Sequence, residues 1–546
     1  MGLLCPYFII SKPKTLLMSC FDQTLTANTK QHTFDVANPD DLRMIQHLYN
    51  RLSFGARKID IEYADGKTIA QVVDDIIDTA LDETIVPIPD DNVFFWAYTT
   101  NKTDPFSAFC ENNCDNPHSN NSVFNPCDDP CENPISAHIG VQRRAALKSE
   151  WVVGMTGKNI AYDSITEKQE IERDVAKSFK YKLVLFWHNH FVIQDPVPFA
   201  AIADIYTYYF ILHNNALKNF KQFTKEVGFC PAMMRYLNVY KSSATLPNEN
   251  YARELLELFT MGLNNPDTNE PNYTEGDIKA IARLLTGWNF GGNSVIIEDP
   301  ANILNVPNCL KYCTLDNCYW DFNSNGDTYP FIRNNHDWET KTFLNGIVTA
   351  NTNPMNQNIQ AGLNEYHQLH DIMFDNRSRS IAHFICTKLY KKYVCHDITE
   401  DAQTFFINEL ANIFENNWEI APVLKKIFKS EHFYDEILMG CQIKSPVDYM
   451  ISFYRLADLE FNKDYFSHAR HFEPNAVVSL FDNDDFGYQK PVSNPKENYH
   501  NSKYIVNDVA ALGQILFTPP NVGGWTEHHS WLNEYTYTNR WVKLKK

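Results

Sequence analysis

Residues 247–262, with the sequence PNENYARELLELFTMG, hold the signals of a helix start, an ordered row of charges and a helix stop. Either Asn248 or Asn250 can cap the first turn, because a short polar side chain accepts a hydrogen bond from a free backbone N–H there. Gly262 can adopt the left-handed conformation that commonly ends a helix. The segment therefore predicts a helix over 249–261.

Helical periodicity dominates the rest of the chain outside its loop-like stretches. Apolar residues recur at three- and four-residue spacing, as they do in helices with one buried face, and strand-like alternation is scarce. Segments with this spacing are 41–53, 67–82, 170–193, 200–224, 249–261, 275–288, 378–394, 401–416, 420–429 and 444–459. The sequence thus predicts a mainly α protein with one or two short β-hairpins.

The domain organisation follows from these helices and from the polar stretches between them. Residues 1–44 predict an N-terminal extension, and residues 45–546 predict a single large helical domain. Long irregular insertions interrupt that domain at 97–136, 289–335 and 482–503. Loops of this length are uncommon inside compact domains and tend to be functional or flexible.

The charge balance narrows the partners of the protein. Its 546 residues include 48 basic and 67 acidic side chains, which gives a net charge of -19. This excess disfavours the attraction on which binding to nucleic acid or to an anionic membrane depends. No apolar run reaches the roughly 18 residues of a membrane span. The N-terminal apolar run precedes its lysines, the reverse of a signal peptide, so a cytoplasmic location is the default expectation.

Four of the thirteen cysteines form two pairs in one polar loop. Cys110 and Cys114 have a three-residue gap between them, and so do Cys127 and Cys131. Common zinc ribbons use two-residue gaps, which weakens a zinc interpretation without removing it. Zinc and disulfides both remain open as hypotheses for these four residues.

Two carboxylates in the first segment are candidates for chemistry. Glu254 and Glu257 project within about 60° of each other on a helix of 3.6 residues per turn. Such a pair can bind a hard cation or divide the roles of acid and base. The alternative is a salt-bridge network centred on Arg253, which lies four residues from both Glu249 and Glu257.

Residues 182–194 are apolar nearly all round, as in a central buried helix. Within them, His188 and His190 point about 200° apart if the segment is helical, so they should not chelate one metal ion together. We predict that His190 belongs to the site and that His188 is a satisfied core residue. A buried histidine is more often structural than a ligand, which is the alternative for both.

Two further loop segments carry polar candidates. His336 and Asp337, with Lys341 nearby, offer an imidazole and a carboxylate for a divalent metal or an acid and base pair. The alternative is a loop held by ordinary hydrogen bonds and ion pairs.

Asp321, Asn323 and Asn325 match the first half of a calcium-binding loop, but Ile332 stands where the bidentate Glu is needed. A β-turn at Asn325–Gly326 between two short strands explains the same residues equally well.

Near the C-terminus, residues 512–525 end in two prolines and a Gly-Gly-Trp sequence. The prolines predict the end of a helix, and Gly523 and Gly524 allow a close backbone approach that can wedge Trp525 against a neighbour. The neighbour is the core or a pocket for a flat ligand. Ser-centred elbows, phosphate loops and dinucleotide fingerprints are absent from the sequence.

Eight segments together resemble the bacterial proteins grouped as domain of unknown function 1800. They are residues 47–56, 182–191, 231–238, 247–262, 273–288, 336–341, 383–394 and 512–525. The resemblance implies a largely helical fold and no established reaction. It also implies export for many members, and it makes a neighbouring family related to alkaline phosphatase a candidate protein partner.

The leading hypothesis is one buried polar site in which distant segments meet. It predicts that the site residues converge, with a divalent metal on His190, Glu254 and His336, and that the protein is a metal-dependent hydrolase. The predicted site residues are His190, Glu254, Glu257, His336 and Asp337. The alternative is a non-catalytic binding or cell-envelope assembly protein whose polar motifs are structural.

Overall fold

The computed structural model describes residues 27–81, 144, 147–157, 167–195, 202–288, 333–457 and 502–544. Within these ranges the protein is built from helices and one two-stranded sheet, so the predicted mainly α fold is confirmed. None of the described helices has the length and apolar character needed to cross a membrane. The predicted calcium loop, the four paired cysteines and most of the three insertions lie outside the described residues.

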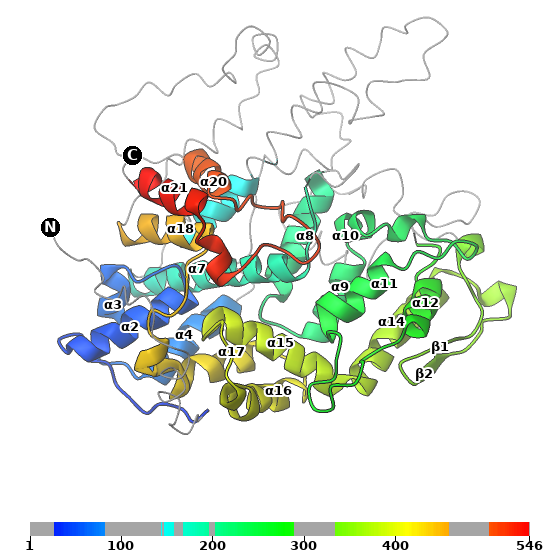
Figure 1. Ribbon diagram of the computed structural model, residues 1–546, viewed down its shortest axis with the longest axis horizontal. Helices are drawn as coiled ribbons and strands as arrows, with labels where there is room; N and C mark the ends of the chain where they lie inside the picture. The colour runs from blue at the N-terminus through cyan, green and yellow to red at the C-terminus, as the bar shows by residue number, and fades with distance from the viewer. Residues whose placement is uncertain are drawn as a thin grey trace, which may run out of the picture.

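Figure 1 shows the N-terminal helices at one end of the long axis and the hairpin at the other. The first half of the fold consists of α2 (Pro39–Leu52), α3 (Lys58–Ala64), α4 (Ile69–Leu81), α7 (Glu167–His190), α8 (Ile202–Asn215), α9 (Phe220–Gly228), α10 (Pro231–Tyr236), α11 (Asn250–Glu254) and α12 (Glu275–Leu284). The second half consists of α14 (Ile359–Asn376), α15 (Ser378–Tyr393), α16 (Asn408–Phe414), α17 (Ile420–Lys429), α18 (Pro446–Leu456), α20 (Ser502–Ala511) and α21 (Glu534–Leu544).

Short helical turns connect these elements. Single 3₁₀ turns are η2 (Val239–Lys241), η5 (Arg333–Asn335), η6 (Pro354–Asn356), η8 (His432–Tyr434), η9 (Glu436–Leu438) and η11 (His528–Trp531). Two π-helical segments, η3 (Leu255–Thr260) and η7 (Ala402–Ile407), adjoin α11 and α16.

Helix α7 runs through the middle of the fold, between the N-terminal helices and α18, α20 and α21 (Figure 1). Its second half is buried on nearly every side, and the 183–187 stretch is at most 7% exposed at each position. A helix that is apolar all round is stable only when other elements cover every face. The prediction of a central buried helix here is therefore confirmed.

The 249–261 helix forms, but it changes type partway. Asn248 accepts a hydrogen bond from the backbone N–H of Asn250 at 3.0 Å, and Gly262 ends the segment with a φ of 71°. Between these ends, α11 gives way to the π-helix η3. A π-helix shifts the pairing of the last carbonyls, so some of them are left for partners outside the helix.

The hairpin pairs β1 (Lys341–Phe343) with β2 (Gly346–Val348) in antiparallel register, Lys341 opposite Val348. Its two turn residues, Leu344 and Asn345, have φ values of 48° and 68°. Two positive φ angles define the mirror-image turn that matches the twist of a hairpin. A short hairpin was predicted, but its site at Asn325–Gly326 lies outside the described residues, and the one seen follows His336.

Several helix predictions need correction. The 200–224 segment is two helices, because Asn219 accepts from the backbone N–H of Gln222 at 3.1 Å and starts a new helix at α9. Helices α3, α10, α14, α20 and α21 were not predicted. Helices α3 and α10 have only seven and six residues, too few to show a clear period. In α14, buried Leu363, Tyr366 and Met373 do stand at three- to seven-residue helical spacing.

The C-terminal segment returns to the end of α7. Asp195 donates its backbone N–H to the Phe517 carbonyl at 2.7 Å, and the Trp525 N–H bonds to Asn189 Oδ1 at 2.6 Å. Gly524 has a φ of 90° and no side chain, so the backbone at this point can come close to Asn189. The structure thus shows the close backbone approach that was predicted for the Gly-Gly-Trp sequence. The segment continues into η11, whose His528 stacks on His396, just after α15.

Candidate functional site

His190 is not an open ligand, because both of its ring nitrogens have partners. Nε2 donates to the Phe259 carbonyl at 2.9 Å, and Nδ1 accepts from Lys388 Nζ at 3.0 Å. Lys388 also donates to the Leu258 carbonyl at 3.1 Å. Both carbonyls belong to η3, so His190 and Lys388 together satisfy the end of the π-helix. Burial lowers the pKa of His190 well below its usual value, with Lys388 adding to the effect.

His188 lies on the other side of α7, as the helical spacing predicted. Its Nδ1 is 2.8 Å from the Tyr208 hydroxyl, while its Nε2 has no hydrogen-bond partner. Burial lowers the pKa of His188 to about 3, so the ring is neutral near pH 7. Of the two rings, His190 is therefore the satisfied one and His188 the incompletely satisfied one, the reverse of the prediction.

Glu254 and Glu257 lie close to each other and are half-buried. Burial and then the charge of Glu257 raise the pKa of Glu254. Glu257 accepts from the Tyr273 hydroxyl at 3.1 Å. Arg253 turns outward and binds both oxygens of Glu275, at 2.8 and 3.0 Å. The salt-bridge alternative is therefore partly realised, with Glu275 as the main partner.

His336 and Asp337 take part in a separate network beside the hairpin. His336 Nδ1 donates to the Thr286 carbonyl at 2.7 Å, and its Nε2 lies 3.2 Å from Glu365 Oε2. The same oxygen accepts from Lys341 Nζ at 2.7 Å. Glu365, on α14, was not predicted as a site residue.

Asp337 is held by a cation of its own. Its two oxygens accept from Arg283 at 2.6 and 3.2 Å. Burial works against the charge of Asp337, but the Arg283 hydrogen bond outweighs it and holds the pKa of that carboxyl below its usual value. An aspartate bound in this way by a guanidinium is an anchoring group.

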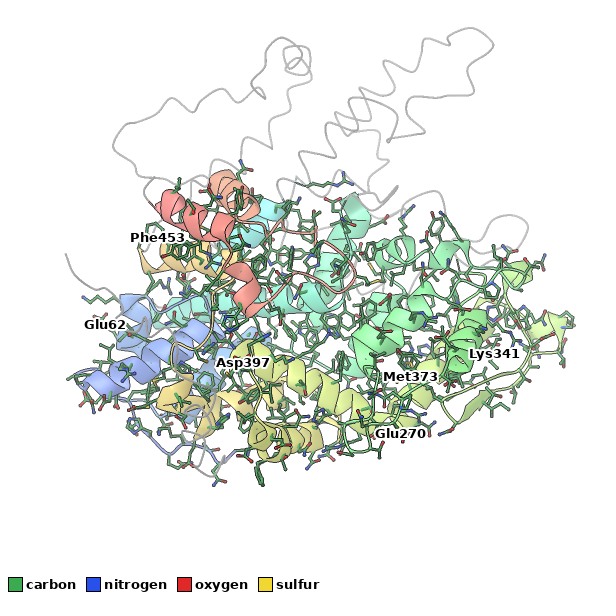
Figure 2. All side chains as sticks on the ribbon, in the orientation of Figure 1. Glu62, Glu270, Lys341, Met373, Asp397 and Phe453 are labelled. Carbon is green, nitrogen blue, oxygen red and sulfur yellow. The ribbon has the colours of Figure 1, made fainter. Side chains whose placement is uncertain are left out.

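The structure does not bring the five predicted site residues into one cluster. Among the described residues, only His396, Asp397 and His528 place three potential ligand atoms within 4.8 Å of one another. Figure 2 shows Lys341, the partner of Glu365, near one end of the long axis, and Asp397 in the half toward the other end. The predicted metal ligands His190, Glu254 and His336 do not form such a group. Backbone carbonyls and side chains of other segments already engage both imidazoles.

The cluster of His396, Asp397 and His528 is assembled from two distant segments. His396 and Asp397 directly follow α15, and His528 begins η11 with a φ of 50°. The two imidazole rings stack with centroids 4.8 Å apart and planes 8° apart. His396 is half-buried, Asp397 is exposed and His528 is buried. Burial, together with the neighbouring His528, lowers the pKa of His396.

The orientation of His528 is set by a backbone carbonyl. Its Nε2 lies 3.2 Å from the Cys441 carbonyl, which can only accept, so the proton sits on Nε2. Its Nδ1 is buried and has no hydrogen-bond partner. Metal-ligating histidines very often donate their second N–H to a carbonyl in this way, which fixes the tautomer and turns the lone pair toward the ion.

A thiol pair supports the carbonyl that orients His528. Arg51 donates to Cys441 Sγ at 3.3 Å, and the Cys395 thiol also hydrogen-bonds to Cys441. The Cys395 hydrogen bond and then the Arg51 charge outweigh burial and lower the pKa of Cys441 to about 6. The loop after α15 and the loop before α18 are thereby tied together.

His396 and His528 line a pocket of about 110 Å³. Its other walls come from α2, α7, the end of α15, the start of α18 and the C-terminal segment. Trp525, 5% exposed, forms part of one wall and packs edge-on against His188 at 5.2 Å. The cationic residues of the lining are Arg51, Lys182, Lys391, Lys392 and Lys444.

The sequence model of the family described as "Protein of unknown function (DUF1800)" matches residues 47–546. The chain belongs to this family. Neither a curated protein nor a solved structure matches it. In this DUF1800 protein, three segments that carried the resemblance, 182–191, 383–394 and 512–525, each contribute residues to the pocket wall. Neither His396 nor His528 was predicted as a site residue. Each follows one of these segments within three residues, and this position was the signal in the sequence that could have identified them.

Proposed function

We propose that His396, Asp397 and His528 hold a divalent metal ion and that the protein is a metal-dependent hydrolase. The observation that carries the proposal is the orientation of His528, whose free Nδ1 is buried within a group of ligand atoms. Two imidazoles and one carboxylate leave coordination positions open, as catalytic sites do and closed structural sites do not. The open positions would adjoin the pocket, because both imidazoles line it.

The chemistry would be hydrolysis by a metal-bound water. A divalent ion lowers the pKa of its water toward neutrality, and Glu527 is placed to take the released proton. Glu527 Oε2 is 4.0 Å from His396 Nδ1, and its Oε1 accepts from Asn189 at 3.3 Å. The hydroxide would form a bond to the electrophilic atom of an ester, the bond to the leaving oxygen would break, and that oxygen would take the proton from Glu527.

The second candidate function is a non-catalytic binding or envelope-assembly role, with a partner such as the alkaline-phosphatase-related family. The saturated networks around His190 and Asp337 favour it, because polar motifs that hold helices together need no reaction to explain them. The two candidates differ in whether the cluster at His528 binds a metal ion.

Metal binding is tested on the full chain by electron paramagnetic resonance with Mn²⁺, after removal of metals with a chelator. Mn²⁺ is chosen because thiolate clusters favour softer ions, so the cysteines of the loops contribute little. We expect one bound Mn²⁺ per chain. Replacing His528 with alanine should weaken its binding about 100-fold or more, since loss of even an outer-shell partner costs 10–100-fold.

The matched control is His529→Ala, which removes the exposed neighbouring imidazole, 4.1 Å from the His528 ring. It should leave Mn²⁺ affinity unchanged. Equal weakening by both variants, or no bound Mn²⁺ in the unaltered chain, would remove the metal site and leave the binding-protein hypothesis.

A further inference from the structure

The pocket beside the His528 cluster carries positive charge that the protein does not neutralise. Five cations line it, and the carboxylates in its wall are Asp448 and Glu527. Arg51 is paired with the Cys441 thiol, whose pKa is lowered to about 6, so with neutral histidines four lysines remain against two carboxylates. The lining therefore has an excess of two positive charges, in a chain whose net charge is -19. Local charge opposite to that of the whole molecule is a feature of sites that attract a charged ligand.

Asp448 neutralises only part of this charge. Its Oδ1 lies 3.1 Å from Lys182 Nζ, and its Oδ2 lies 3.5 Å from Lys392 Nζ. Lys182 also donates to the carbonyls of Asn50 and Ser53, at 3.0 and 2.5 Å. Lys182 is thus held as a structural cation, and both carboxylate oxygens of Asp448 are engaged by lysines.

Two lysines remain for a ligand. Neither Lys391 nor Lys444 has a carboxylate partner within 4.0 Å among the described residues, and both are half-buried in the pocket wall. They approach from different elements: Lys391 from the last turn of α15 and Lys444 from the loop before α18. Burial lowers the pKa of Lys444, the Asp448 charge opposes this effect, and the Arg51 charge adds to it.

The size of the pocket limits the ligand to a small group. Pockets for whole drug-sized ligands are about 300–1,000 Å³, whereas this one is about 110 Å³. A headgroup fits inside, with the rest of the molecule outside. Two excess charges match a dianion better than a singly charged carboxylate. A tetrahedral phosphate group has that charge, and its several oxygens can accept from more than one lysine.

We infer that the pocket binds the phosphate group of a phosphomonoester between Lys391 and Lys444. The inference rests on the proposed function for its reaction, because the His528 cluster would place the metal-bound hydroxide beside the phosphorus atom. With a metal ion bound there, a hydroxide oxygen would form the new P–O bond, the bond to the ester oxygen would break, and the alcohol would leave with the proton held by Glu527. The lysines neutralise charge on the phosphoryl oxygens.

Binding is tested by titration calorimetry with inorganic phosphate on the full chain, both metal-depleted and loaded with Mn²⁺. We expect the metal-depleted chain to bind phosphate, and Lys391→Gln and Lys444→Gln each to weaken binding about tenfold, as the loss of one charge-assisted hydrogen bond does. Sulfate should compete with phosphate for the pocket, and acetate should not. Lys425→Gln is the control, because Lys425 pairs with Asp78 at 2.6 Å on α4, outside the pocket lining.

The outcomes separate the two proposals. Phosphate binding that depends on Lys391 and Lys444, with no bound Mn²⁺, would support the anion site and refute the metal site. Bound Mn²⁺ without phosphate binding, or phosphate binding that the two variants leave unchanged, would overturn the inference alone. We expect the Mn²⁺-loaded chain to hydrolyse p-nitrophenyl phosphate but not p-nitrophenyl acetate. The opposite preference would overturn the inference of a phosphate site. Thermal unfolding of each variant confirms that it is folded.

Discussion

Replacing Asp60 with asparagine is expected to lower the free energy of unfolding by about 3–5 kcal/mol, because it removes one partner from a buried ion network. Asp60 and Arg455 are both 0% exposed, and their charged groups are 2.8 Å apart. Arg57 binds the same carboxylate at 2.8 Å. In the variant, Arg455 would stay buried without this negative charge, with the carbonyls of Gly55 and Thr156 and a neutral amide beside it. Urea denaturation of both chains measures the difference.

The same carboxylate should contribute to the loss of stability in acid. Burial alone raises the pKa of Asp60, but Arg455 and Arg57 outweigh it and hold that pKa below its usual value. A group whose pKa is depressed on folding stabilises the protein fully above its unfolded pKa of about 3.9. That stability is lost as the pH falls through the folded pKa. The asparagine variant should therefore lose less stability below about pH 4 than the unaltered chain does.

Glu62 provides the control on the same helix. Its side chain is 59% exposed, and its pair with Lys58 spans 3.5 Å at the surface. Glu62→Gln should change the free energy of unfolding by no more than about 0.5 kcal/mol, as exposed pairs do. If Asp60→Asn cost as little as Glu62→Gln, the network would not hold α3 to α18.

Replacing Gly524 with alanine is expected to cost about 2–4 kcal/mol and to disrupt the His528 cluster. A Cβ atom there would lie 2.4 Å from Asn189 Oδ1 and 2.7 Å from the Asn189 carbonyl oxygen. The φ of 90° adds backbone strain for any residue with a side chain. Strain and overpacking each cost about 1–3 kcal/mol. The segment that carries Trp525 and His528 would have to move away from α7, so Mn²⁺ affinity should fall with stability.

Variants at two other glycines separate the effect of backbone strain from that of the contact with Asn189. Gly66 has a φ of 72° with no atom within 4 Å of an added Cβ, so Gly66→Ala measures strain without a clash. Gly523→Ala would meet only Asn521 Oδ1, at 3.1 Å, and tests the loop without the contact to Asn189. Both should leave Mn²⁺ binding intact. A Gly524→Ala chain that binds Mn²⁺ as tightly as the unaltered chain would show that the close approach is dispensable.

Local sequence predicted the parts of the fold that local interactions stabilise. The helix over 249–261 was found from its cap, its spacing and its terminal glycine, and α7 from its apolar character on all sides. The break between α8 and α9 was missed, because a cap at Asn219 competes with an apolar pattern that continues through it. Helix α14, with Glu365, was not predicted, although its buried Leu363, Tyr366 and Met373 stand at helical spacing.

The candidate site depended on contacts between distant segments, which spacing cannot reveal. His190 and His336 have the chemistry of ligands, but whether a ring nitrogen is free depends on which backbone carbonyl lies next to it in the fold. For His190 that carbonyl is one of the last of η3, a π-helical segment whose departure from α geometry its composition does not indicate.

By itself the sequence determined the helical class, the family, the central helix α7 and the close approach of the Gly-Gly-Trp sequence, since each depends on side chains near one another along the chain. Only the tertiary structure decided which imidazoles are engaged and which are open. It brought His528 to His396 and gathered lysines from three elements around one pocket. The physical reason is that hydrogen bonds and charge pairing act over a few ångströms in space, whatever the separation along the chain.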